Sequence, residues 1–152
     1  MDVGAQTVFF ESLINRGSLP ALERMVAFTE ERHGMLAENI ANIDTPGYRT
    51  KQLDARAFQR ALREALDRRG GDHKAPFAMR GTRQFRQRPG GSLEVTPTLE
   101  PTENVLFHDG TNARLERQMT DLAENAMMHQ FATQMLKGRY DGMISAIRGV
   151  VG

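Results

Sequence analysis

Few residues in this 152-residue chain have the chemistry for metal binding or acid–base catalysis: it has four histidines and no cysteine. His33, His73, His108 and His129 show neither the His-x-x-x-His spacing of a helical metal site nor the flanking glutamate of a metalloprotease. His33 and His129 fall within periodic apolar patterns, where a packed histidine is the expected arrangement. We therefore predict no catalytic residue, no metal site and no cofactor.

Acidic and glycine pairs have ordinary structural interpretations. Glu30, Glu31 and Glu124 fall on helical faces, where we expect them to be solvated. The pairs at 70–71 and 90–91 are Gly-Gly, but they lack the lysine and the strand–helix flanks of a phosphate-binding loop. The sequence therefore predicts a protein that is not an enzyme.

A basic segment occupies the middle of the chain. Residues 49–88 carry 12 basic and 4 acidic side chains, whereas both flanking segments are acidic and the whole chain has a net charge of +1. No aromatic side chains alternate with these arginines to stack on bases, so we expect an electrostatic contact face and no nucleic-acid binding. Two alternatives stay open: a helical adaptor that pairs with a partner helix, or an RNA-binding module that uses Arg56, Arg60, Arg63, Arg68 and Arg69.

Composition favours one domain, mainly helical and with a thin core. Hydrophobic residues make up 39% of the chain and aromatic residues 7%, and the mean hydropathy is −0.50. The N-terminus has no basic region followed by a long apolar run, and no segment approaches the ~18 apolar residues of a membrane span. We expect neither a cleaved signal peptide nor membrane insertion.

The first 48 residues divide into a short tail and a long helix. Residues 1–17 have one short apolar face and end at a turn signal, which predicts an N-terminal docking tail. Ser18 is placed to cap the helix that follows, within the segment 18–48. From there one face recurs in steps of four and three residues, as in a heptad repeat: Leu22, Val26, Thr29, His33, Leu36, Ile40 and Ile43.

A turn motif ends this helix. Pro46 has no backbone donor, and Gly47 suits the positive φ that a type II turn requires at its third position. Two asparagines on the last helical turn have amides that can bond free carbonyls or the first amides of the turn. We predict a corner with a fixed exit angle, formed by Asn39, Asn42, Thr45, Pro46, Gly47 and Tyr48.

The basic middle segment, 49–110, begins with a shorter helix. Asp54 is placed to cap a helix over about 55–69, and glycine follows at 70. Residues 70–110 hold four of the six prolines and six of the fourteen glycines, which predicts a long irregular segment with at most a weak strand at 92–96. Such a segment suits an elongated protein whose middle part packs on neighbouring subunits.

The last segment, 111–152, has the strongest periodicity. Apolar and seam positions alternate in steps of four and three: Leu115, Met119, Leu122, Ala126, His129, Thr133, Leu136, Tyr140, Met143, Ile147 and Val150. Met127, Met128, Phe131 and Met135 widen the stripe, which predicts contact with more than one neighbour. We predict an elongated all-α fold in which the N- and C-terminal heptad helices pair as a coiled coil. The residues expected to mediate helix–helix assembly are Leu22, Val26, Leu36, Ile40, Leu115, Met119, Leu122, Leu136, Met143 and Ile147.

Residues 36–49, Leu-Ala-Glu-Asn-Ile-Ala-Asn-Ile-Asp-Thr-Pro-Gly-Tyr-Arg, resemble the N-terminal signature of bacterial flagellar rod, hook and other axial proteins. Chain length and the C-terminal runs at 115–126 and 142–147 are similar to those of a proximal member of the flagellar basal-body rod protein family, with another rod protein such as FlgC as the alternative. The resemblance covers about 18–69 and 109–148. Arg114 departs from it, because an acidic residue is expected in the first turn of the last helix.

The resemblance implies a structural subunit of the rod that self-assembles through its terminal helices and transmits torque from the motor to the hook. It implies homo- and hetero-oligomers with rod proteins such as FlgC and FlgF, with FliE and with the base of the basal body. It also implies export through the flagellar type III apparatus without a cleaved signal, followed by residence in the periplasmic rod. We expect motility to depend on this assembly.

Overall fold

The fold is mainly helical, with α2, α3 and α4 as its helices in the part of the chain described. The computed structural model describes residue 4 and residues 19–70, 72, 74–101 and 110–149. The element order is α2 (Leu19–Ala41), β1 (Lys51–Gln52), α3 (Ala55–Arg69), β2 (Phe85–Gln87), β3 (Leu93–Val95), β4 (Thr98–Leu99) and α4 (Gly110–Ile147). The predicted docking tail and the Ser18 cap lie outside the described residues.

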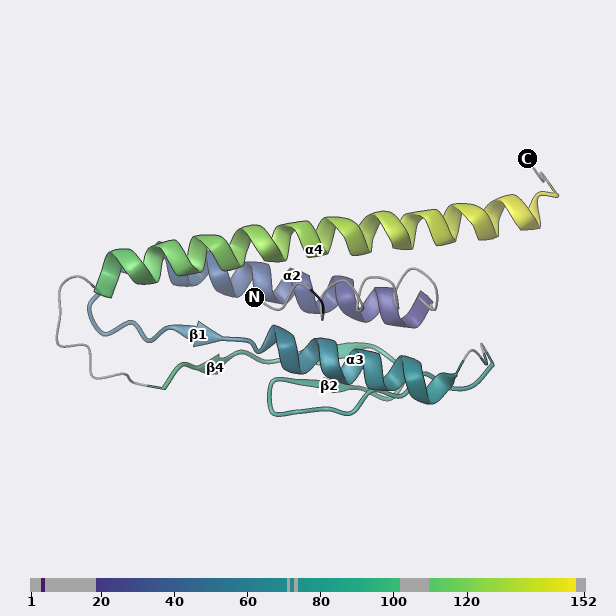
Figure 1. Ribbon diagram of the computed structural model, residues 1–152, viewed down its shortest axis with the longest axis horizontal. Coiled ribbons are helices and arrows are strands. Elements are labelled where there is room, and N and C mark those ends of the chain that lie inside the picture. Colours follow the sequence, from purple (N-terminus) through teal and green to yellow (C-terminus); the bar gives the residue numbers. More distant parts are fainter. Residues whose placement is uncertain (1–3, 5–18, 71, 73, 102–109, 150–152) are drawn as a thin grey trace.

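Three layers form an elongated molecule (Figure 1). The long helix α4 lies along one side of α2, and α3 with the short strands packs against another side of α2, where Gln59 of α3 reaches Met128 of α4 (3.8 Å). At about 1.5 Å per residue, the 38 residues of α4 extend about 57 Å, longer than the 23 residues of α2 can cover. The C-terminal end of α4 therefore projects beyond the start of α2.

The predicted turn after α2 is confirmed. The Tyr48 backbone N–H donates to the Thr45 carbonyl (3.1 Å), and Gly47 has φ 78°, as the third position of a type II turn requires. The helix ends at Ala41, close to the Pro46 that prevents its continuation. The chain leaves this corner and enters β1.

The predicted middle helix is also confirmed, together with both of its caps. The Asp54 carboxylate accepts a hydrogen bond from the Ala57 N–H (2.9 Å), which satisfies a donor of the first turn. Gly70 has φ 63°, and its N–H donates to the Leu66 carbonyl (3.2 Å). Asp54 and Gly70 together define α3 as Ala55–Arg69.

The segment after α3 is more ordered than the sequence indicates. β2 and β3 form an antiparallel pair, and β1 pairs in an antiparallel register with β4, so that the two ends of the middle segment meet. The weak strand predicted at 92–96 corresponds to β3. Gln84 joins the two pairs, because its side chain accepts from the Asp54 N–H (2.8 Å) and donates to the Gln52 carbonyl (3.1 Å) and the Thr98 hydroxyl (2.7 Å).

The core contains an aromatic cluster between α2, α3 and β2. Phe28 stacks on Phe58 with ring centroids 4.0 Å apart, and Phe85 meets both rings edge-on, at 6.1 Å and 5.5 Å. All three side chains are buried. Since each ring comes from a different element, the cluster fixes the position of the middle segment against α2.

Helices α2 and α4 lie side by side in antiparallel orientation, but the predicted seam needs a correction. Of the α4 positions predicted for it, Leu122, His129 and Leu136 are partly buried, whereas Met119 is 57% exposed. The prediction placed Ala126 and Thr133 in the seam, but both are exposed. The buried seam residues are the ones that precede them, Asn125 and Ala132. On α2 the predicted seam residue His33 is exposed.

This correction has a physical reason. Ala132 is small enough for α4 to come close to α2, and the Asn125 side-chain amide donates to the Thr29 carbonyl (2.8 Å). A search for apolar residues at heptad spacing passes over both features, because one position is small and the other is polar. The pairing of the terminal helices agrees with the prediction, whereas its coiled-coil geometry stays a prediction.

Candidate functional site

The two described histidines, which could in principle bind a metal or act as acid–base groups, lie apart from one another. His33 lies exposed on α2 and His129 lies on α4 against Thr29, while the other two histidines lie outside the described residues. The described part of the chain contains no group of three or more His, Cys, Asp or Glu side chains that could hold a metal ion. Within the same residues, no helix has the length and apolar character to cross a membrane.

The corner after α2 is organised around Asn39, whose side chain is buried. Its Nδ2 donates to the Lys51 carbonyl (2.8 Å) and to Gln118 Oε1 (3.1 Å). Its Oδ1 accepts from the Lys51 backbone N–H (3.0 Å) and from the Tyr48 hydroxyl (2.9 Å). Both donors and both acceptor positions of the amide are therefore used. The Asn39 amide bonds both the N–H and the carbonyl of Lys51, as the backbone of a neighbouring β-strand would. Its four hydrogen bonds together join α2, the turn, β1 and α4.

Electrostatics at the corner favour the hydrogen bond from Tyr48. Burial raises the pKa of Tyr48, and the negative charge of nearby Glu38 raises it further, while Lys51 opposes this. The phenol therefore stays protonated and remains a donor to Asn39. The Lys51 ammonium bonds both carboxylate oxygens of Glu38, at 2.7 and 2.9 Å, on the partly exposed side of the corner.

The second asparagine of the motif, Asn42, has a local role. Its Nδ2 donates to the Glu38 carbonyl (2.9 Å), and its Oδ1 accepts from the Thr45 hydroxyl (3.4 Å). The Thr45 backbone N–H also donates to the Asn42 carbonyl (2.9 Å). Asn42 thus stabilises the helix end and the turn, as the sequence predicts, whereas Asn39 makes a tertiary contact that the sequence does not reveal.

Polar contacts continue from the corner along the α2–α4 seam. Arg32 pairs with Asp121 (3.3 Å), and Thr29 Oγ1 lies 2.8 Å from His129 Nδ1. Near the start of α2, the Tyr140 hydroxyl donates to Glu23 Oε1 (2.9 Å). With Asn39–Gln118 and Thr29–Asn125, these contacts occur at intervals along the whole length of α2 and permit one antiparallel register of the two helices.

Beyond the start of α2, the apolar stripe of α4 has no cover in the described structure. The exposed fractions are 51% for Met143, 45% for Ile144 and 83% for Ile147, whereas Tyr140, which is 41% exposed, still reaches Glu23 of α2. Large apolar side chains gathered in this way at the end of a projecting helix indicate a protein contact. Met143 and Ile147, both predicted for assembly, therefore lie where another chain can reach them.

The other residues predicted for assembly lie mostly against the protein's own core. Leu22 and Leu36 are buried, and Val26, Leu122 and Leu136 are partly buried against the core. Ile40 and Leu115 are partly buried as well, whereas Met119 is exposed on the face of α4 that the groove does not use. Their part in assembly between subunits stays a prediction.

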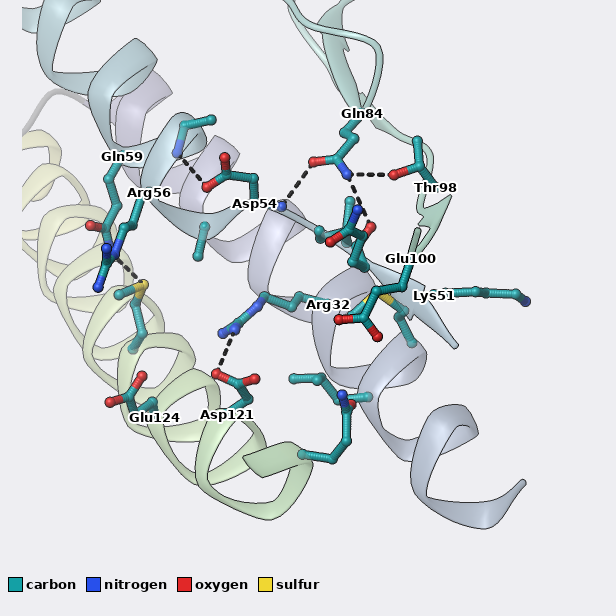
Figure 2. A pocket seen from close by; sticks show the side chains of 18 of the residues that line it. Arg32, Lys51, Asp54, Arg56, Gln59, Gln84, Thr98, Glu100, Asp121 and Glu124 are labelled. Carbon is teal, nitrogen blue, oxygen red and sulfur yellow. Dashed lines mark hydrogen bonds and ion pairs between the residues drawn. The ribbon is translucent and has the colours of Figure 1, made fainter. Parts of the chain in front are cut away.

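An open groove lies between α3 and α4 (Figure 2), bridged where Gln59 Nε2 of α3 donates to Met128 Sδ of α4 (3.8 Å). Its volume is about 1630 Å³, and it is lined by α2 around Arg32 and Met35, by the start of α3, by β1 and β4, and by one face of α4. Figure 2 shows Asp121 and Glu124 on the α4 wall and Arg56 on the α3 wall. No sequence pattern predicted this groove, because its walls come from five segments of the chain: 32–36, 51–59, 82–84, 98–100 and 117–131.

The described part of the chain is elongated and mainly helical, and its exposed apolar side chains are typical of a structural subunit that contacts other chains. Comparison with known proteins identifies a particular family within this class. No protein-family model matches the chain. The flagellar basal body rod protein FlgB of Escherichia coli (strain K12) is 31% identical over 123 residues, which cover 78% of this chain and 83% of that protein.

Proteins of the same name in other bacteria are also similar. The relative in Cereibacter sphaeroides is 27% identical over 139 residues, covering 88% of this chain and 96% of the relative. That of Bacillus subtilis is 21% identical over 134 residues, covering 88% of this chain and 95% of the relative. The chain therefore belongs to the flagellar basal body rod protein FlgB family. This family consists of structural proteins, which confirms the prediction that the chain is not an enzyme.

Proposed function

We propose that this chain is a self-assembling subunit of the proximal rod and that it transmits torque from the motor toward the hook. The single observation that carries the proposal is the uncovered apolar end of α4. Full burial of a side chain such as Met or Ile contributes about 1.5–3 kcal/mol. Met143, Ile144 and Ile147 together therefore offer several kcal/mol to any contact that covers them, enough to drive association between subunits.

Torque transmission requires a subunit that does not bend where its layers meet. The corner at Asn39 supports this role, because one buried amide bonds to the turn, β1 and α4 at once. The aromatic cluster of Phe28, Phe58 and Phe85 holds the middle layer to α2 in the same way. A load on α4 passes through α2 into the middle segment without a flexible joint between them.

The neighbours in this proposal are further copies of the chain, the rod proteins FlgC and FlgF, FliE and the base of the basal body. The proposal also includes export through the flagellar type III apparatus without a cleaved signal, followed by assembly in the periplasm. Support comes from membership of the family and from the exposed apolar end of α4, which favours partners over an isolated monomer.

Basal bodies from a strain that lacks the gene provide the test. We expect electron micrographs to show bases without a rod, cells that do not swim, and recovery of both when the full chain is supplied. The supplied chain should also be found in purified basal bodies by a tag on the protein. An intact rod in the deletion strain would overturn the proposal.

A further inference from the structure

Two apolar patches are exposed in the described part of the chain, at different positions along the long axis of the molecule. The first is the α4 tip, which we define as residues 137–148 with Tyr140, Met143, Ile144 and Ile147. The second lies in the α3–α4 groove, where Met127 is 66% exposed and Leu99 48% exposed. The two are about 20 residues, or about 30 Å, apart along α4. Two different patches on one chain allow a head-to-tail contact, which repeats from copy to copy.

The groove suits a helix better than a small molecule. Its volume of about 1630 Å³ exceeds the roughly 300–1,000 Å³ of typical small-molecule sites, and it is open to the surface. Met127, Met128 and Phe131 form an apolar wall on α4, and Met35 of α2 lies between the walls. Methionines adapt their shape to an inserted apolar surface. An amphipathic helix laid along the mouth of the groove, over the Gln59–Met128 contact (3.8 Å), would cover Met127 and Leu99.

Charges on the tip match those of the groove walls. Glu124, beside Met127 and Met128 on the α4 wall, has no ion pair among the described residues. Arg139 lies on one flank of the tip's apolar stripe, and Asp141, two residues on, lies on the other flank, because residues two apart on a helix do not share a face. Arg139 can therefore meet Glu124 while Asp141 meets Arg56 on the α3 wall.

We propose that the α4 tip of one copy of this chain docks in the α3–α4 groove of the next copy, with Arg139 against Glu124. This inference rests on the proposed function, because it names the contact through which the subunits would assemble. The contact is heterologous: it uses one end of each subunit and leaves the other end free. Copies joined in this way form an open chain or helix and no closed dimer.

Disulfide formation between two marked forms of the full chain tests the docking, since the protein has no cysteine of its own. One form carries Met127→Cys and a first tag, and the other carries Met143→Cys and a second tag, because Met143 follows Arg139 by four residues as Met127 follows Glu124 by three. After mixing and mild oxidation, we expect a disulfide-linked species with both tags. Met119→Cys, at another exposed α4 methionine outside the groove, replaces Met127→Cys in the control and should give at least 10-fold less of that species.

Charge reversal adds a test of orientation. Glu124→Arg in the groove form should lower the yield several-fold, and Arg139→Glu in the tip form should restore it. Equal yields for Met127→Cys and Met119→Cys, or no species with both tags, would overturn the docking. In cells, cross-linking of Met127→Cys only to another basal-body protein would also overturn it. The proposed function fails separately, if the deletion strain still builds a rod.

Discussion

Replacing Asn39 with alanine is expected to lower the free energy of unfolding by about 3 kcal/mol. The substitution removes four hydrogen bonds of a buried side chain, two with Lys51 and one each with Tyr48 and Gln118. A hydrogen bond contributes about 0.5–1.5 kcal/mol net, and a buried backbone group left without a partner adds to the loss. Four such bonds sum to about 2–6 kcal/mol, and about 3 kcal/mol lies in the lower half of this range because the Tyr48 hydroxyl and the Gln118 amide can bond water once Asn39 is removed.

Thermal or urea unfolding of the purified chain, followed by circular dichroism, measures this difference. For a domain of this size, 3 kcal/mol corresponds to a fall in Tm of about 6–12 °C. Asn42→Ala is the matched control, because Asn42 has the same side chain but only local and exposed contacts. It should cost less than about 1 kcal/mol. Equal losses for the two variants would refute the view that Asn39 joins the layers.

Two further predictions concern the turn and the β2–β3 hairpin. Gly47→Ala meets no neighbouring atom, but φ is 78° there, so unfolding experiments should show a loss of about 1 kcal/mol from backbone strain alone. Hydrogen bonds from Arg86 and Arg88 lower the pKa of Glu94 from 4.5 to about 2, so its contribution to stability is complete above pH 4.5 and disappears as the pH falls toward 2. Urea unfolding should accordingly depend less on pH in this range for Glu94→Gln than for the original chain, and an unchanged pH dependence would contradict the assignment.

Local chemistry made several elements predictable from the sequence. Asp54 and Gly70 have the side chain and the backbone freedom that helix caps need, and they define α3 as expected. Pro46 and Gly47 determine the turn in the same way, because their backbone preferences act within four residues. Where all the residues that determine an element lie within one short segment, the sequence is sufficient to predict that element.

Contacts between distant segments were harder to predict. The helical period placed Leu122 and Leu136 against the core, but it gave Met119 a seam position that the structure leaves exposed. Asn125 and Ala132 take part in the seam because one donates to a backbone carbonyl of α2 and the other is small. Neither property shows in a count of apolar residues.

The middle segment and the groove show the same limit. Each strand there has only two or three residues, and its partner lies up to about 48 positions away, as for Lys51 and Leu99. Pairs of this kind leave no local pattern beyond scattered apolar residues among glycines and prolines. The groove depends on five separate segments of the chain together, among them parts of α2, α3 and α4. Only the arrangement of the layers shows that Asn39, read first as part of a helix stop, also joins α2 to β1 and α4.

The most direct test of the central claim is rod assembly with a charged α4 tip. Met143→Asp combined with Ile147→Asp places two carboxylates in exposed positions, so the purified chain should unfold at nearly the same temperature as the original. Gln130→Asp combined with Gln134→Asp adds the same charge to exposed polar positions of the same helix and is the control. In a deletion strain that expresses each variant, we expect electron micrographs of basal bodies to show a rod with the control and no rod with the tip variant. A complete rod built from the tip variant would contradict the account.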